Sequence, residues 1–261
     1  MSGSSLPGLN YRGMWTLYKH EVARAVRTAG QSIVAPVMTT ALYFVVFGSA
    51  IGSRMSTVGS VDYGAFIVPG LMMMSILTQS ISNASIAIYF PKFTGTVYEI
   101  LSAPLGYGEV LVAYVGGAAT KSVLIGLIIL ATATFFVDLH IVHPLAMLGF
   151  LLLTSITFSL LGFIIGVWAA NFEQLGFVPM LVITPLTFLG GAFYSVDMLP
   201  EPWRTATLFK PVVYLISGFR WSFFGKGDVS ILLSLGMTAL FMALAVGAIA
   251  WIFRTGWKIK P

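Results

Sequence analysis

The sequence predicts an all-α polytopic membrane protein, and three observations indicate that fold class. Hydrophobic residues occupy 57% of the 261 positions and charged residues only 9%, whereas about 25% of a typical soluble domain is charged. Six stretches with little or no charge are long enough to cross a bilayer, which takes about 20 apolar residues in a helix. None of the six alternates in polarity as a membrane β-strand does, so helices are expected.

The charges at the ends of these stretches set the limits of six expected transmembrane helices. Their approximate ranges are 31–51, 64–88, 109–136, 145–169, 175–194 and 231–253. Lys121 is the one charge inside a span, where it can snorkel, pair with Glu99 or Glu109, or face a watery cavity. Two motifs of small residues predict close helix packing, either within one subunit or at a dimer seam. They are Gly48-x-x-x-Gly52 and Gly162-x-x-x-Gly166.

Basic residues predict the orientation, because cytoplasmic loops carry an excess of Lys and Arg. Four precede the first span and three follow the last, namely Arg12, Lys19, Arg24, Arg27, Arg254, Lys258 and Lys260. With six spans, both termini are then cytoplasmic, although the segment 195–230 carries four basic residues and would face outward. The pI of about 9.5 is interpreted as attraction to anionic lipid rather than to nucleic acid. The absence of cysteine excludes disulfides and thiolate metal sites.

Residues 11–27 predict an amphipathic helix. At about 100° per residue its apolar side chains share one side and its basic side chains the other. The apolar side comprises Tyr11, Met14, Trp15, Tyr18, Val22, Ala25 and Val26. Such a helix suits the cytoplasmic membrane interface; the alternative is a solvated helix on a soluble partner.

The segment 92–105 predicts a short cytoplasmic helix after the second span. Thr96-x-x-Glu99 matches a capping box, and Pro104 ends the helix. Val97, Ile100 and Leu101 give it an apolar edge. The helix is either a plain connection or a docking element for another protein.

The segment 195–226 predicts a broken re-entrant structure on the outer side. Gly190-Gly191 interrupts the fifth span, and prolines divide the residues after it into two pieces too short to cross the bilayer. Aromatic and basic side chains would then lie near lipid headgroups, namely Trp203, Tyr214, Trp221 and Arg220. The alternative is an ordinary structured periplasmic loop.

No catalytic or metal-binding residues are expected. The stretch Gly116–Ser122 superficially resembles a phosphate loop, but Thr120 replaces the required glycine. No carboxylate sits in the middle of a span, which argues against an ion-coupled secondary transporter. The only cluster that could serve a lipid-modifying enzyme is Asp138, His140 and His143, and three residues beside Pro144 are too few.

Two longer motifs resemble those of the permease subunits of ABC-2-type exporters, the YadH-type bacterial permeases most of all. The first is Lys92-x-x-Gly-Thr-Val-x-Glu-Ile-Leu-x-Ala-Pro-Leu105, similar to the coupling-helix loop of that family. The second is Pro185-Leu-Thr-Phe-Leu-Gly-Gly-Ala-Phe-Tyr-Ser-Val-Asp-Met-Leu-Pro200 and the Lys210-Pro211 region after it. The resemblance covers essentially the whole chain and implies a single transmembrane domain over residues 1–261.

The resemblance also implies the partners and the roles of individual residues. Two copies of the permease would pair with two ATP-binding subunits in a bacterial inner membrane, ATP and Mg staying on the ATPases. Five residues would couple the chain to the ATPase: Lys92, Thr96, Glu99, Leu101 and Pro104. Six would belong to the outer segment and the substrate path: Phe193, Tyr194, Trp203, Lys210, Tyr214 and Arg220. Spans two and five would line that path, and the cargo would be an amphipathic, lipid-linked or drug-like compound.

Overall fold

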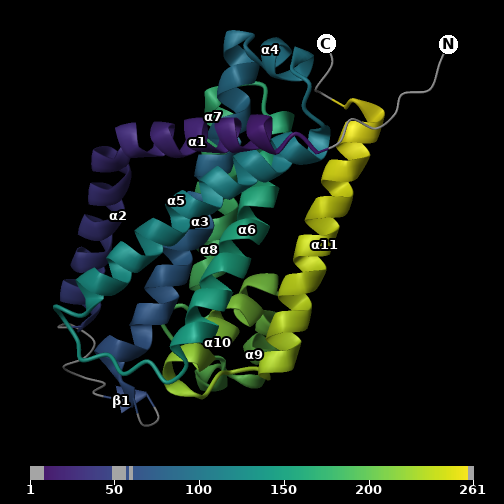
Figure 1. The fold of residues 1–261 in the computed structure, drawn as a ribbon. Helices are drawn as coiled ribbons and strands as arrows, with labels where there is room; N and C mark the ends of the chain where they lie inside the picture. Colours follow the sequence, from purple (N-terminus) through teal and green to yellow (C-terminus); the bar gives the residue numbers. More distant parts are fainter. Residues whose placement is uncertain (1–8, 49–56, 59–60, 258–261) are drawn as a thin grey trace.

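The computed structural model describes residues 9–48, 57–58 and 61–257, and helices dominate them (Figure 1). Four helices are long and apolar enough to cross a membrane: α3 (Tyr63–Thr94), α5 (Tyr107–Ala133), α6 (Pro144–Trp168) and α11 (Ile231–Thr255). The chain is therefore an all-α, multi-span protein, apart from the two-residue antiparallel strands β1 (Thr57–Val58) and β2 (Val61–Asp62).

The described residues contain four of the six expected spans as long apolar helices. The first and fifth expected spans differ from such helices, each in its own way. The first expected span follows α1 (Tyr11–Arg27) as α2 (Ala29–Tyr43) and the π-helical turn η1 (Phe44–Gly48). α1 and the helix Ser32–Phe47 form a bent pair, at 56°, which passes the length test only when the two are taken together. The fifth expected span is the shorter apolar helix Phe172–Phe188.

That fifth segment is continuous but irregular. It comprises α7 (Phe172–Val178), the π-helical turn η2 (Pro179–Ile183) and α8 (Thr184–Phe188). Pro179 and Pro185 lack the N–H that a regular helix uses, which accounts for the widened turn between α7 and α8. After the turn at Gly190 the chain continues through η3 (Val196–Met198), α9 (Glu201–Leu208) and α10 (Pro211–Phe224).

Local sequence explains where the long helices begin and end. The carboxylate of Asp62 accepts a hydrogen bond from the Gly64 N–H at 2.9 Å and so caps the start of α3. Gly95 ends α3 with a φ of +80°, a left-handed conformation that glycine adopts without a steric cost. α6 begins at Pro144, whose missing N–H costs nothing in the first turn.

α3 is the central helix of the bundle and packs against both α5 and α6. Gly162 and Gly166 of α6 face it so closely that a methyl group on Gly166 would lie 2.5 Å from the Ser85 carbonyl oxygen. This Gly-x-x-x-Gly motif therefore packs within the chain. Gly52, in the other motif, lies outside the described residues.

α1 forms as predicted over residues 11–27 and lies across α5 at one end of the bundle, hereafter the α4 end (Figure 1). The Tyr18 hydroxyl is 2.9 Å from the Thr120 hydroxyl, and Glu21 is buried against Gly117. Tyr11, Trp15 and Val26 of its predicted apolar side stay exposed. Part of the predicted apolar side thus packs against α5 and part remains exposed for a membrane surface, while Arg24 pairs with the buried Glu21 carboxylate.

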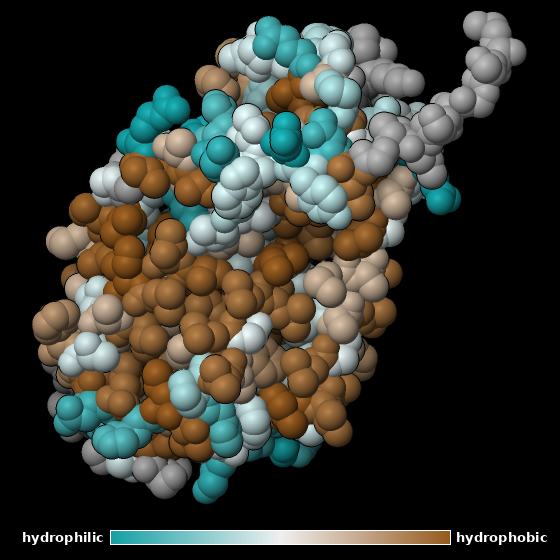
Figure 2. Space-filling model, in the orientation of Figure 1, coloured by the Kyte–Doolittle hydropathy of each residue, from teal (hydrophilic) through white to brown (hydrophobic). Residues whose placement is uncertain are grey.

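On the face that Figure 2 shows, a broad hydrophobic belt crosses the middle of the molecule, with hydrophilic residues gathered at both ends. α11 contributes strongly to that exposed surface. Only 17% of its apolar 18-residue stretch is buried, whereas 83% of the corresponding stretch of α3 is buried. Large exposed apolar areas are rare on soluble monomers. The belt is the surface expected of a protein surrounded by lipid.

Candidate functional site

The expected coupling helix is α4 (Val97–Ser102), and it projects at the α4 end of the bundle between α3 and α5 (Figure 1). Glu99 and Tyr98 are exposed there. Pro104 ends the helix as predicted, because Ala103 before it is extended (ψ 151°). The side chain of Leu101, another predicted coupling residue, lies outside the part of the structure that can be described.

The predicted capping box at Thr96 and Glu99 does not form. The Thr96 side chain gives no capping hydrogen bond to α4, and its backbone is already helical (φ −67°, ψ −11°). Its hydroxyl lies 3.0 Å from the Thr94 hydroxyl instead. A capping threonine needs an extended backbone to reach forward, so the sequence pattern was met without the geometry. Glu99 is therefore exposed without this local role.

Lys92 holds the end of α6. Its ammonium donates hydrogen bonds to the carbonyl oxygens of Val167, at 2.9 Å, and Ala169, at 3.3 Å. A cation is favourable at a helix C-terminus, where the last carbonyl groups lack partners within the helix. Lys92 thus ties the base of the coupling loop to the bundle.

A second connection joins the coupling loop to α1. The Glu109 carboxylate, 8% exposed, accepts hydrogen bonds from the Gly106 N–H at 2.8 Å and from the Asn10 N–H. The Asn10 amide in turn donates to the Pro104 carbonyl oxygen at 3.1 Å and caps α1 through the Gly13 N–H. We name Asn10, Pro104, Gly106 and Glu109 the loop clamp. It links the start of α1, the end of the coupling loop and the start of α5.

The outer segment is anchored by a close backbone contact at the opposite end of the bundle, hereafter the α10 end. Gly191 has a φ of +87° and turns the chain back after α8. A methyl group on Gly70 of α3 would lie 2.0 Å from the Ala192 carbonyl oxygen, so only glycine admits this approach. The Tyr63 hydroxyl also donates to the Phe193 carbonyl oxygen at 3.3 Å. The Gly-Gly break predicted from the sequence is thus a turn packed on α3.

Arg220 does not lie among exposed headgroup-facing residues as predicted, because it is 3% exposed inside this end of the bundle. Its guanidinium donates to the Asp228 carboxylate and to the Gly191 carbonyl oxygen, both at 2.6 Å. It also stacks over the Phe66 ring, 4.1 Å from the centroid. Ser195 donates to the same carboxylate. We name Gly191, Ser195, Arg220 and Asp228 the outer clamp.

The other predicted outer residues are divided between core and surface. Phe193 joins an aromatic cluster with Phe47 and Phe188. The ring centroid of Phe193 lies 4.8 Å from that of Phe47 and 4.8 Å from that of Phe188. The remaining four lie nearer the surface or use their polar atoms locally. Trp203 is 66% exposed, Lys210 precedes α10, and the hydroxyls of Tyr194 and Tyr214 donate to the carbonyl oxygens of Leu189 and Leu208.

Sequence reasoning missed the burial of Glu21 and Asp228, and it named Glu109 only as a possible partner of Lys121. Glu109 instead bonds Asn10, 99 positions away, while Glu21 pairs with Arg24 on its own helix. Lys121, by contrast, stood out as a charge within a span. Its ammonium donates to the hydroxyls of Ser32, at 2.9 Å, and Thr28, at 3.3 Å. Within the described ranges no group of three His, Cys, Asp or Glu could hold a metal ion.

Comparison with known proteins identifies the family of the chain. The ABC-2 type transporter family model matches residues 12–224. The inner membrane transport permease YadH of Escherichia coli K12 is 37% identical over 236 residues, covering 90% of this chain and 92% of YadH. Nodulation protein J of Rhizobium leguminosarum bv. viciae is 27% identical over 248 residues, 94% of each chain. The chain described here belongs to the ABC-2 type transporter family.

Proposed function

We propose that the chain is the permease subunit of an ATP-driven exporter, powered by a separate ATP-binding subunit that carries ATP and Mg. The observation that carries this proposal is α4, an exposed helix fixed at its base to the rest of the bundle. Its Tyr98 side chain is 55% exposed, so a docking surface is available. A helix that only connected two spans would not need attachments to both α6 and α1.

Those attachments give α4 a route to the membrane helices. Lys92 bonds the loop to the end of α6, and the loop clamp bonds it to α1 and α5. A displacement of α4 by an ATPase that closes around nucleotide would therefore move α1 and the ends of two spans together. Coupled movement of packed elements is how binding at one site reaches another.

The proposal places the α4 end in the cytoplasm of a bacterial cell, with both termini on that side of the inner membrane. It follows from the basic residues of α1 and from the need of an ATPase to reach α4. A second copy of the chain completes a symmetric path, as one bundle encloses only half of it. The whole of residues 1–261 acts as one transmembrane domain in this arrangement.

The proposed cargo is an amphipathic, lipid-linked or drug-like compound leaving the cytoplasm. The wide apolar belt and the 36 aromatic side chains suit a cargo that moves with part of its surface in lipid. Named transport permeases among the relatives support transport. The chain itself would hydrolyse nothing.

The test is reconstitution with a candidate ATP-binding-cassette subunit from the same organism. Proteoliposomes would be loaded with a rhodamine dye or a fluorescent undecaprenyl-linked sugar, and ATP-dependent movement of each would be followed. We expect one of them to move only when both subunits and ATP are present, and the purified permease alone to hydrolyse no ATP. ATP hydrolysis by the permease alone, or failure of the two subunits to associate, would contradict the proposal.

A further inference from the structure

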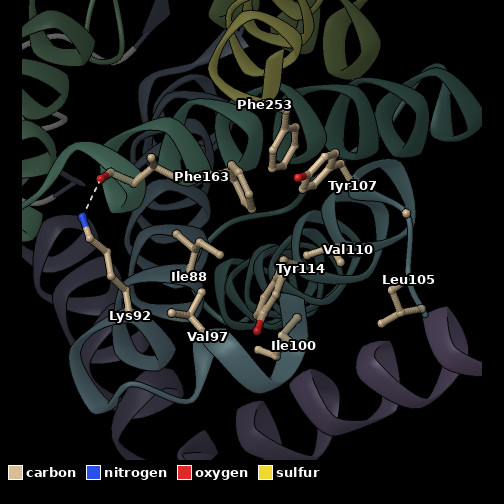
Figure 3. Close-up of a pocket in the computed structure, with 12 residues that line it drawn as sticks. Ile88, Lys92, Val97, Ile100, Leu105, Tyr107, Val110, Tyr114, Phe163 and Phe253 are labelled. Carbon is tan, nitrogen blue, oxygen red and sulfur yellow. Dashed lines mark hydrogen bonds between the residues drawn. The ribbon is translucent and has the colours of Figure 1, made fainter. Parts of the chain in front are cut away.

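A partly enclosed cavity of about 310 Å³ lies behind α4 (Figure 3). Its lining comes from five helices, α3, α4, α5, α6 and α11. This volume is at the lower end of the range of about 300–1,000 Å³ that small-molecule pockets span. The proposed coupling surface does not use the cavity, because that surface is the opposite, exposed side of α4.

The chemistry of the lining is that of a hydrocarbon site. Phe163, Tyr114 and Val167 form its deep part, and each is at most 3% exposed. The only charged side chain in the lining is Lys92, and Figure 3 shows its ammonium turned outward to the carbonyl of Val167. A nucleotide, sugar or ion would thus find no charged group directed at it, and burying it here would be unfavourable.

Tyr114 brings a hydroxyl to this lining. The Tyr114 residue is 1% exposed, and it also borders a second pocket, which Glu21 and Arg24 line. Because no charged group is directed into the cavity, its occupant is expected to be apolar over most of its length.

The cavity lining reaches exposed residues beside α11. Gly106 and Tyr107 of the lining are exposed, and the Tyr107 ring stacks on Phe253 of α11 with centroids 4.8 Å apart. α11 presents exposed apolar side chains along its length, including Leu244 and Trp251. A hydrocarbon chain from lipid beside α11 would need only to pass these two rings.

We propose that this cavity binds one acyl chain of a phospholipid from the leaflet at the α4 end. The chain lies behind the coupling helix, with Val97 and Ile100 of α4 covering it and the apolar lining around it. Lipid would then support α4 from behind while its other face remains open. The site depends on the proposed function only for calling that leaflet cytoplasmic.

The experiment uses the full chain alone in nanodiscs, without ATPase or ATP, so its result is independent of transport. A phosphatidylethanolamine with a photoactivatable diazirine in one acyl chain is the probe, and labelled peptides are mapped by mass spectrometry. Val110→Phe and Ile100→Phe fill the cavity from α5 and α4. Val112→Phe is the matched control, since Val112 stands two residues from Val110, is 57% exposed and does not line the cavity.

We expect labelling of residues 88–114 in the parent, a severalfold loss in both filling variants and parental labelling in Val112→Phe. Gel filtration and thermal unfolding identify any variant that has lost its fold, and the other filling variant then decides. Equal labelling in a folded filling variant and in Val112→Phe, or label found only on the outer surface of α11, would overturn the proposal.

Discussion

Burial determines how much the charged residues at the α10 end contribute to the stability of the fold. Arg220 and Asp228 are 3% and 7% exposed at their side chains, whereas Arg204 and Asp197 form a 2.9 Å ion pair that is 45% and 63% exposed. Removing one partner of a buried pair leaves an unpaired charge out of water, which costs about 3–5 kcal/mol. An exposed pair contributes only about 0–1 kcal/mol because water screens it.

Asp228→Ala is therefore expected to lower the free energy of unfolding by about 3–5 kcal/mol, through the Arg220 charge that it leaves unpaired. Asp197→Ala is the matched control and should change it by less than about 1 kcal/mol. Thermal and denaturant unfolding in detergent micelles would compare the two. If both variants unfold together with the parent, the outer clamp does not stabilise this end of the bundle.

Two glycines on α6 differ in whether helix packing requires them: Gly166 is in close contact with α3, whereas Gly149 has open space around it. A methyl group on Gly166 would lie 2.3 Å from Ile88 Cγ2 and 2.5 Å from the Ser85 carbonyl oxygen, while one on Gly149 would meet nothing within 4 Å. Contacts under 3.0 Å force the two helices apart. The same substitution on one helix should therefore have opposite consequences at the two positions.

Gly166→Ala is expected to destabilise the bundle by about 1–3 kcal/mol, the usual cost of overpacking. Gly149→Ala should be neutral or slightly stabilising, since alanine favours a helix by about 1 kcal/mol over glycine. Unfolding midpoints in the same detergent give the comparison. Equal midpoints for the two variants would mean that α3 and α6 are not packed as described.

The proposed coupling role belongs to α4 as an element, and Glu99 gives a way to test it. Because Glu99 is exposed and does not cap the helix, Glu99→Ala should leave folding and membrane insertion unchanged. Transport by the reconstituted complex should fall severalfold, while the ATPase subunit keeps its basal hydrolysis. Leu152→Met, a conservative change at an exposed position of α6, serves as control and should transport like the parent.

The long helices could be predicted from sequence because apolar length and local stop signals are properties of neighbouring residues. The expected span 64–88 lies inside α3, and 231–253 lies inside α11. The Gly190-Gly191 break was predicted in the same way, since glycine permits the positive φ of Gly191. The extent of the first span could not be predicted in this way. The 56° bend between α1 and the helix after it depends on how both helices pack against α5.

The short helix after α3 was predictable in position but its contacts were not. Lys92, expected to couple the chain to the ATPase, holds the end of α6 as well, while Thr96 fits a capping pattern without the backbone conformation that capping needs. Both clamps bring together residues far apart in the chain, such as Asn10 and Glu109. Hydropathy treats a lone carboxylate as surface, so its burial is decided only when helices pack.

The exposed surface of the whole bundle separates into parts with different expected neighbours. α11 is exposed along the membrane depth, and so is the segment α7–α8, where Met180 is 73% exposed. The resemblance to ABC-2 exporters assigns the fifth span, which is α7–α8 here, to the central path between two copies. α3, the other span assigned to that path, is mostly buried within its own chain, so its exposed apolar edge, which includes Ile86, Phe90 and Phe93, is the part that a second copy could contact.

A two-fold dimer is expected at the scale of the whole molecule, and native cysteine is absent, so introduced cysteines report on it without background. Across a two-fold axis the same patch meets itself. Met180→Cys should therefore form disulfide-linked dimers when membranes are oxidised, whereas Leu232→Cys, on α11 and 79% exposed, should stay largely monomeric beside lipid. Gel mobility before and after reduction measures both.

Efficient cross-linking through Leu232→Cys with none through Met180→Cys would move the seam to α11, and full transport by nanodiscs holding one permease copy would exclude the dimer. A seam at α7–α8 would also bring the irregular turn η2 of each copy to the axis, where a span that is not a regular helix can shift without breaking a complete hydrogen-bond ladder.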